Sequence, residues 1–344
     1  MDKIKNLTRK DVILILGILA IIAIAYQIKN IILLFFASFV IASGLNLAVD
    51  FMSKKIPRKI AVLLLYLTGF IFLAIVFIPL FSILIKQFVL FLKQVPAYWL
   101  AIEKLINNWI TIGKDFGISA NFLQIISSTG NFAQNIANKS INLTINLFTG
   151  LIITFTLSML VLYMLLDKPK LKSGYLKFFP PNIREEAEHI SIIISQKVGG
   201  YVIGQLMLMA SIALLVTLGL LIIKVDFALL LGLIAGILDI IPIVGPIFAV
   251  SIAALVALSQ KPILVIGILF IYMIAQWIQD TFLRPLILGK FLDLHPLIII
   301  FALLVSASTL GIAGVVLSPA IAATIYVLIN ELYLKKINSE IYFT

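Results

Sequence analysis

The chain has 344 residues, of which 62% are hydrophobic and 12% are charged, and its formal net charge is +11. About a quarter of the residues in a soluble domain are charged, so this composition excludes an ordinary soluble protein. The chain holds no cysteine, which excludes disulfides, thiolate zinc sites and thiol nucleophiles. Apolar runs longer than about 18 residues recur along it, as in transmembrane helices. We therefore predict one all-α, polytopic membrane protein embedded in a lipid bilayer.

The basic residues lie in short clusters beside the apolar runs. They do not form a groove with interleaved aromatic side chains, so we expect no nucleic-acid partner. Four Lys or Arg residues precede the first apolar run, four lie within 52–59 and six within 167–198. Because cytoplasmic loops are enriched in Lys and Arg, we predict a cytoplasmic N-terminus and place both loops on the same side.

The N-terminal part, residues 1–85, is expected to hold three spans, at about 12–28, 31–51 and 60–85. The first apolar run resembles a signal peptide, but a second run follows at once from Ile31, which favours a retained helix.

The segment 86–145 differs from its surroundings. It is rich in Asn and interrupted by glycines, yet apolar residues recur at helical spacing. This pattern predicts amphipathic helices that lie on the membrane surface or pack together outside it.

The transmembrane core is predicted in 146–344. Further elements are expected at 146–166, 180–199, 200–223 and 262–279, the second of them an amphipathic helix and the others spans.

Two apolar stretches of this core, 227–258 and 297–330, are too long for single spans. As straight helices they would rise about 48 and 51 Å, against a hydrocarbon core of about 30 Å. Breaks are expected near 239–246, which reads DIIPIVGP, and near 306–319, which contains Gly311 and Pro319. Proline removes a helix donor and clashes with the preceding turn. We predict two discontinuous helix pairs, each a re-entrant hairpin or a broken span, as in secondary transporters with inverted repeats.

Asp239 is the first candidate for a functional residue. An ionisable group flanked by apolar residues at membrane depth is expensive and usually functional. The alternative is a carboxylate at a loop tip that caps a helix or reaches the interface. Pro242, Gly245 and Pro246 belong to the same break, where unwound backbone can share a cation or a polar ligand.

The other candidates for substrate binding, ion binding or coupling are Gln205, Gln276, Gln279, Asp280, Arg284 and His295. The spacing of Gln276, Gln279 and Asp280 predicts a shared helical face, which either lines a polar pathway or caps the span at the interface. Asp280 and Arg284 are spaced to pair.

Two of these candidates have structural alternatives. Histidine is the residue type that most often serves proton-linked roles, so one interpretation of His295 is a proton-linked role, but a lone histidine before a proline also fits a structural role. Gln205 lies among glycines that permit close helix packing, so it either packs or bonds across helices.

Signatures of enzymes are missing from the sequence. It has no G-x-x-x-x-G-K-[ST] phosphate loop, no H-E-x-x-H zinc site and no G-x-S-x-G elbow. We expect no enzymatic activity, no cofactor and no bound metal, and ATP-driven pumping by this chain alone is disfavoured.

Several motifs resemble one known family. They are IPRKIA at 56–61, DIIPIVGP at 239–246, Arg284-Pro285, Gly289-Lys290 and LHPL at 294–297. In order and spacing they resemble the autoinducer-2 exporter family of bacterial permeases, over nearly the whole chain. The resemblance implies an inner-membrane transporter of about eight membrane segments that forms homo-oligomers, with a pentamer as the implied assembly. It also implies one of two substrates, the furanone signal autoinducer-2 or sodium and lithium exchanged for protons.

Two functions from different classes follow. The first is a secondary transporter that exports a small polar molecule or exchanges a monovalent cation for protons. The second is a non-transporting membrane scaffold whose segment 86–145 recruits partners. Broken helices around a buried carboxylate favour the transporter.

Overall fold

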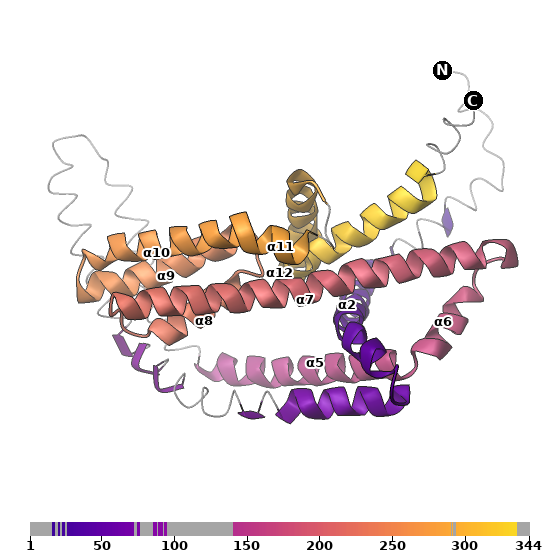
Figure 1. The fold of residues 1–344 in the computed structure, drawn as a ribbon, viewed down its shortest axis with the longest axis horizontal. Coiled ribbons are helices and arrows are strands. Elements are labelled where there is room, and N and C mark those ends of the chain that lie inside the picture. The colour runs from indigo at the N-terminus through magenta and orange to yellow at the C-terminus, as the bar shows by residue number, and fades with distance from the viewer. Residues whose placement is uncertain are drawn as a thin grey trace, which may run out of the picture. The chain divides into compact units, whose positions relative to one another are not determined.

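The structure, a computed structural model, describes residues 16–17, 20, 23–24, 26–71, 74–75, 85–87, 89–91, 93–94, 140–289, 291 and 294–335. The predicted span at 12–28 and the segment 86–145 therefore lie mostly outside the described residues. Every regular element within the described ranges is a helix (Figure 1). The predicted all-α fold class is confirmed.

The helices follow one another along the chain without an intervening strand in these ranges. They are α2 (Lys29–Met52), α5 (Ser140–Leu166), α6 (Lys168–Leu176), η2 (Pro181–Ile183), α7 (Arg184–Ile222), α8 (Ala228–Leu238), α9 (Val244–Gln260), α10 (Leu264–Ile278), η3 (Gln279–Leu283), α11 (Arg284–Leu288), α12 (Pro296–Ile329) and η4 (Asn330–Leu334).

The chain divides into two compact units, each built from separate segments. The first unit comprises Met1–Leu47, Thr156–Gly199 and Leu294–Thr344, and the second comprises Ala48–Phe155 and Gly200–Asp293. The first unit holds α6 and α12, and the second holds the run from α8 to α11. Helices α2, α5 and α7 contribute to both.

Four helices among the described residues are long and apolar enough to cross a membrane. They are Lys29–Met52, Pro181–Ile222, Leu264–Leu288 and Leu297–Tyr333. A fifth crossing arises if Ile152–Leu166 and Lys168–Leu176, which meet at 79°, form one broken span. The protein is thus a multi-pass membrane protein, as its composition indicates.

Helix α7 differs from the prediction of a separate amphipathic helix and span. The two segments form one continuous helix of 39 residues. Gly199 and Gly200 do not interrupt it, and both lie where a neighbouring segment approaches closely. A Cβ at Gly199 would overlap the backbone oxygen of Ser43, and one at Gly200 would overlap the ring of Phe291.

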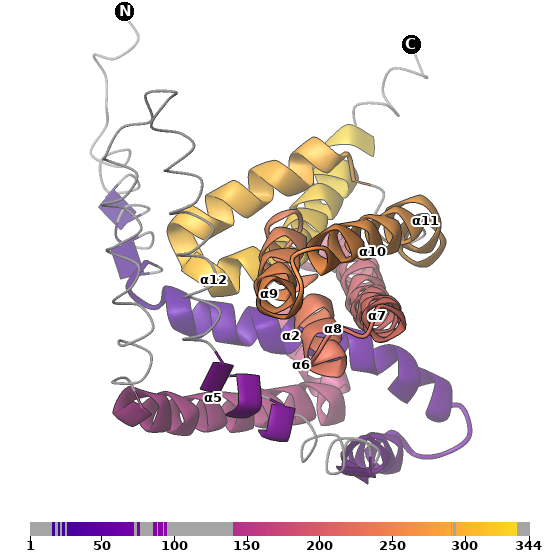
Figure 2. The same cartoon turned by 90° about the vertical axis from the view of Figure 1, so that its left-hand side faces the viewer.

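Helix α12 contains the second predicted break. Gly311 has φ 65° and ψ −150°, a conformation open almost only to glycine. Figure 2 shows α12 as two arms that meet at a bend. Pro319 lies inside the second arm and does not end it. At the bend, Lys29 Nζ donates a hydrogen bond of 3.1 Å to the backbone oxygen of Thr309.

Helices α8 and α9 form the first predicted break. They have 11 and 17 residues, and would rise about 17 and 26 Å, less than a hydrocarbon core of about 30 Å. They pack against each other, and α9 also packs against α10. The pair is therefore a helical hairpin in which neither helix alone is long enough to cross the bilayer.

The break in this hairpin is shorter than predicted. Only residues 239–243 lie outside the helices, while Val244, Gly245 and Pro246 form the first turn of α9. Proline is tolerated there because the first turn of a helix needs no backbone N–H from it.

Small residues let the hairpin pack closely in the second unit. A Cβ at Gly232 would overlap Thr217 Oγ1, and one at Gly236 would clash with the backbone oxygen of Met209, both on α7. This spacing of two glycines is typical of close helix pairs in membranes. The core continues with small and branched residues, among them Leu231, Ala235, Ala249, Ala253, Val256, Ala257 and Ile268.

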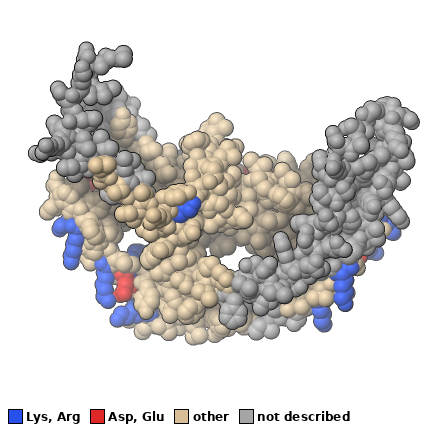
Figure 3. All heavy atoms as spheres, turned by 180° about the vertical axis from the view of Figure 1, so that it is seen from behind, with Lys and Arg blue, Asp and Glu red and all other residues tan. Residues whose placement is uncertain are grey.

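The described surface is largely uncharged. Figure 3 shows one face on which most described side chains are neither acidic nor basic. Large apolar side chains such as Phe51, Phe70 and Leu286 are exposed. Lipid is the solvent that makes such exposure favourable.

Candidate functional site

Asp239 lies at the C-terminal end of α8, where the hairpin begins to turn. Its backbone N–H still bonds to the backbone oxygen of Ala235, at 3.0 Å, so the residue is held by the helix. The residue is only 5% exposed. A carboxylate in such a place requires partners, because burying an uncompensated charge is costly.

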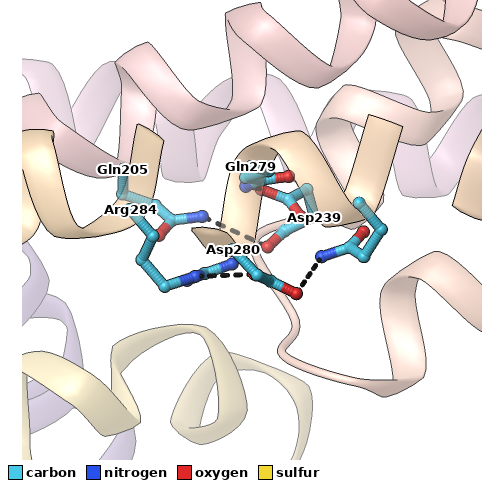
Figure 4. Close-up of polar contacts among 6 residues, drawn as sticks. Gln205, Asp239, Gln279, Asp280 and Arg284 are labelled. Atoms are coloured by element: carbon cyan, nitrogen blue, oxygen red, sulfur yellow. Dashed lines mark hydrogen bonds and ion pairs between the residues drawn. The ribbon is translucent and has the colours of Figure 1, made fainter. Parts of the chain in front are cut away.

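Gln279 is the partner of the Asp239 side chain. Its Nε2 donates a hydrogen bond of 2.7 Å to Asp239 Oδ2 (Figure 4), and the residue is 0% exposed. Its other amide atom, Oε1, is buried without a hydrogen-bond partner among the described residues. The contact joins residues 40 positions apart in the chain.

The short π-helix η3 follows α10 at Gln279. It begins at this residue and interrupts the run from α10 to α11. A π-helical turn adds one residue to the helical repeat, and such turns are frequent at functional sites.

Gln205 supports the same corner from α7. Its Nε2 donates a hydrogen bond of 3.1 Å to the backbone oxygen of Asp239, and the residue is 7% exposed. Gly204, one residue earlier, leaves room for Leu288 of α11. Of the two interpretations of Gln205, the cross-helix hydrogen bond is confirmed.

Gln276, Asp280 and Arg284 form a separate chain of contacts on the more exposed side. Gln276 Nε2 lies 3.2 Å from Asp280 Oδ2, and Arg284 Nε lies 3.0 Å from Asp280 Oδ1. The predicted pairing of Asp280 with Arg284 is confirmed. The predicted shared face is only partly present, because Gln279 faces Asp239 instead of Gln276 and Asp280.

The turn of the hairpin contains a residue that sequence reasoning missed. Ile243 has φ 67° and ψ −55°, and the N–H of Val244 donates to the oxygen of Pro242 at 2.7 Å. These values describe a γ-turn of the rare, strained form. No sequence signal marks it, because β-branched residues avoid positive φ. Gly245 follows, and a Cβ there would overlap the backbone oxygen of Leu238.

His295 belongs to the first unit and has a local role. It precedes α12, and its Nδ1 accepts a hydrogen bond of 3.3 Å from the N–H of Leu297. The side chain thus satisfies a donor at the start of a helix, as N-cap residues do. This contact fits the structural interpretation of His295.

The site contains one buried carboxylate, two buried amides and the main chain of an interrupted helix pair. Within the described ranges, no three His, Asp or Glu side chains come together as a metal-binding group. A single carboxylate with amide oxygens can accept a proton, a monovalent cation or a polar group.

Comparisons with known proteins agree with this architecture. YueF of Bacillus subtilis (strain 168), named as a candidate transport protein, is 29% identical over 289 residues, covering 81% of this chain and 78% of YueF. The sodium-lithium/proton antiporter of Halobacillus andaensis is 24% identical over 325 residues, 90% of this chain and 92% of that protein. The sequence pattern of the AI-2E family transporter matches residues 13–334. The expected family is therefore confirmed, and the chain belongs to the AI-2E family of membrane transporters.

Proposed function

We propose that this protein is a secondary transporter that exchanges sodium or lithium ions for protons. Asp239 is the carboxylate that binds the proton and the cation in turn. The observation that carries the proposal is its burial at the end of the short apolar helix α8, beside a buried amide. The name of the Halobacillus andaensis relative supports the same chemistry.

The burial of Asp239 provides a reason for strict exchange. An empty, ionised carboxylate at this depth is costly, whereas a protonated one or one bound to a cation is neutral overall. The site therefore favours being occupied by one or the other throughout the cycle. Coupled exchange requires that the site always holds either a proton or a cation and does not change sides when it is empty.

Export of a small polar molecule, such as the autoinducer-2 signal, is the second candidate. The family name favours it, and the amides of Gln205 and Gln279 are groups that bind polar solutes. A scaffold that recruits partners through 86–145 would leave the buried Asp239 without a role.

Location and assembly belong to the same proposal. We infer a bacterial-type inner membrane, a cytoplasmic N-terminus and a homo-oligomer, with the pentamer implied by the family resemblance. The basic clusters within 52–59 and 167–198 support the orientation.

A liposome assay tests the exchange. Purified protein is reconstituted into vesicles that are loaded with sodium chloride and a pH-sensitive dye, then diluted into choline chloride. Outward sodium movement should acidify the interior of vesicles that contain the wild-type protein. Asp239→Asn should abolish this acidification, because an amide cannot exchange a proton for a cation at this position.

The matched control is Asp226→Asn. Asp226 is an exposed acidic residue in the connection before α8, and the substitution makes the same chemical change outside the site. It should exchange like the wild type. Wild-type rates with Asp239→Asn would refute the role of Asp239, and furanone efflux without sodium-driven acidification would favour the second candidate.

A further inference from the structure

We propose that Gln279 is a direct ligand of the transported cation. In this arrangement its Oε1 and the carboxylate of Asp239 together form a monovalent-cation site. The inference rests on the proposed function, because it takes Asp239 as the exchanging carboxylate. It assigns Gln279 to that site as a second residue. The Nε2 end of its amide holds Asp239, and the Oε1 end binds the cation.

The unpartnered Oε1 of Gln279 is the first observation. Leaving a buried acceptor without a donor costs about 1–3 kcal/mol, so such atoms call for an explanation. Among the described residues, Ser53 Oγ, Gln260 Oε1 and Gln279 Oε1 are buried in this way. Of these three side chains, Gln279 is the one that is hydrogen-bonded to a carboxylate.

The direction of the hydrogen bond is the second observation. Gln279 donates Nε2 to Asp239 Oδ2, and the described residues give Asp239 Oδ1 no hydrogen-bond donor. One end of the amide thus holds the carboxylate in place. The other end and the second carboxylate oxygen remain available as oxygen ligands.

The charge of the site selects the class of cation. Hard cations such as sodium and lithium prefer carboxylate and carbonyl oxygens. One carboxylate balances one positive charge, which suits a monovalent ion. Asp280, the nearest other acid on the same helix run, is already bonded to Arg284 and Gln276, so its charge is largely compensated.

The surrounding structure holds both ligands in place. Gln205 bonds to the main chain of Asp239, and Gln279 is the first residue of the π-helix. A binding site works best when its ligands are fixed by such supporting contacts. The N–H of Gln279 still bonds to the backbone oxygen of Ala275 in the last turn of α10, so that helix fixes the residue beside Asp239.

Cation binding to the purified protein tests the inference without any transport step. The melting temperature is measured in detergent while sodium or lithium chloride replaces choline chloride at constant ionic strength. A bound cation stabilises the folded state by mass action, so the wild-type melting temperature should rise with sodium and lithium. Gln279→Met, which keeps the length but removes Oε1, should weaken the apparent affinity at least about tenfold, or about 1.4 kcal/mol.

Gln279→Glu separates a ligand from a positioning residue. Glutamate keeps an oxygen where Oε1 lies but has no N–H to hold Asp239. If Gln279 is a ligand, this variant should keep a sodium- or lithium-dependent rise in melting temperature. If Gln279 acts only through its Nε2, glutamate should lose the rise as methionine does, and the inference would be wrong.

Gln260→Met is the matched control. Gln260 also has a buried Oε1 without a partner among the described residues, but no described carboxylate bonds to its amide. The melting temperature of this variant should rise with sodium and lithium as that of the wild type does. The inference would be overturned if Gln279→Met bound the cations with wild-type affinity. It would also be overturned if neither sodium nor lithium changed the melting temperature of the wild-type protein.

The two proposals fail in different ways. If Asp239→Asn loses exchange while Gln279→Met binds sodium like the wild type, the exchange proposal stands and the ligand role of Gln279 is wrong. If Asp239→Asn exchanges at the wild-type rate, the proposed function itself is wrong.

Discussion

The corner around Asp239 depends on close approach as much as on polar contacts. Gly245 lies where the start of α9 passes the end of α8, and its missing side chain makes room for the oxygen of Leu238. The same region carries the carboxylate, so a displaced backbone would also displace Asp239. Gly245 is therefore needed for packing and only indirectly for chemistry.

Gly245→Ala should destabilise the hairpin. The added Cβ would overlap a backbone oxygen, which cannot rotate away as a flexible side chain can. Forcing atoms into a packed site costs about 1–3 kcal/mol. We expect a melting temperature several degrees lower for the purified protein, together with weaker sodium-driven acidification of vesicles.

Gly150→Ala provides the comparison. No atom lies within 4 Å of the Cβ that it would add, and alanine favours a helix over glycine by about 1 kcal/mol. This variant should melt at or above the wild-type temperature. A Gly245→Ala protein as stable as Gly150→Ala would mean that the hairpin relaxes without cost.

Single residues of the site could be predicted to different degrees. Asp239 stands out in the sequence because apolar residues flank it. Its partnership with Gln279 does not, since the contact joins two helices and spans 40 positions. Helical spacing predicts that Gln279 shares a face with Gln276 and Asp280. In the structure the amide of Gln279 bonds to Asp239 of the neighbouring hairpin, whereas Gln276 bonds to Asp280.

The interruptions of the helices could be predicted from the length of the two apolar stretches and from the proline and glycine residues within them. Both long apolar stretches are interrupted as expected, because neither fits a bilayer as one straight helix. The positions of the breaks needed the structure. In α12 the interruption is at Gly311 and not at Pro319, and in α8–α9 the turn ends at Ile243, before the second proline of the motif.

Helix α7 shows where local rules fail. Gly199-Gly200 weakens a helix by propensity, which predicts a boundary there. In the structure, each glycine instead admits a neighbour too close for a side chain. Tertiary packing thus overrides propensity, and no local pattern reveals it.

The orientation of the whole chain in the membrane rests on its basic clusters. Because the protein contains no cysteine, single-cysteine variants can report accessibility without background labelling. Lys55 and Ser173 are exposed residues within two of these clusters. We predict that both residues lie on the cytoplasmic side of the membrane.

Lys55→Cys and Ser173→Cys should each resist a membrane-impermeant maleimide added to intact cells. Both should react after the membrane is permeabilised, which controls for local burial. Labelling of either cysteine from outside the cell would invert the proposed topology.

The left-handed turn at Ile243 has a consequence for the populations of conformers. A β-branched residue held at positive φ costs about 1–3 kcal/mol, and each 1.4 kcal/mol changes an equilibrium tenfold. A second conformation of the hairpin in which Ile243 has negative φ would not carry this cost. The free-energy difference between the observed conformation and such a second conformation is therefore smaller by that amount. Glycine adopts positive φ without this cost, so Ile243→Gly should stabilise the observed conformation relative to the second one. We expect slower ion exchange in vesicles. An unchanged rate would mean that this turn keeps its shape throughout the cycle.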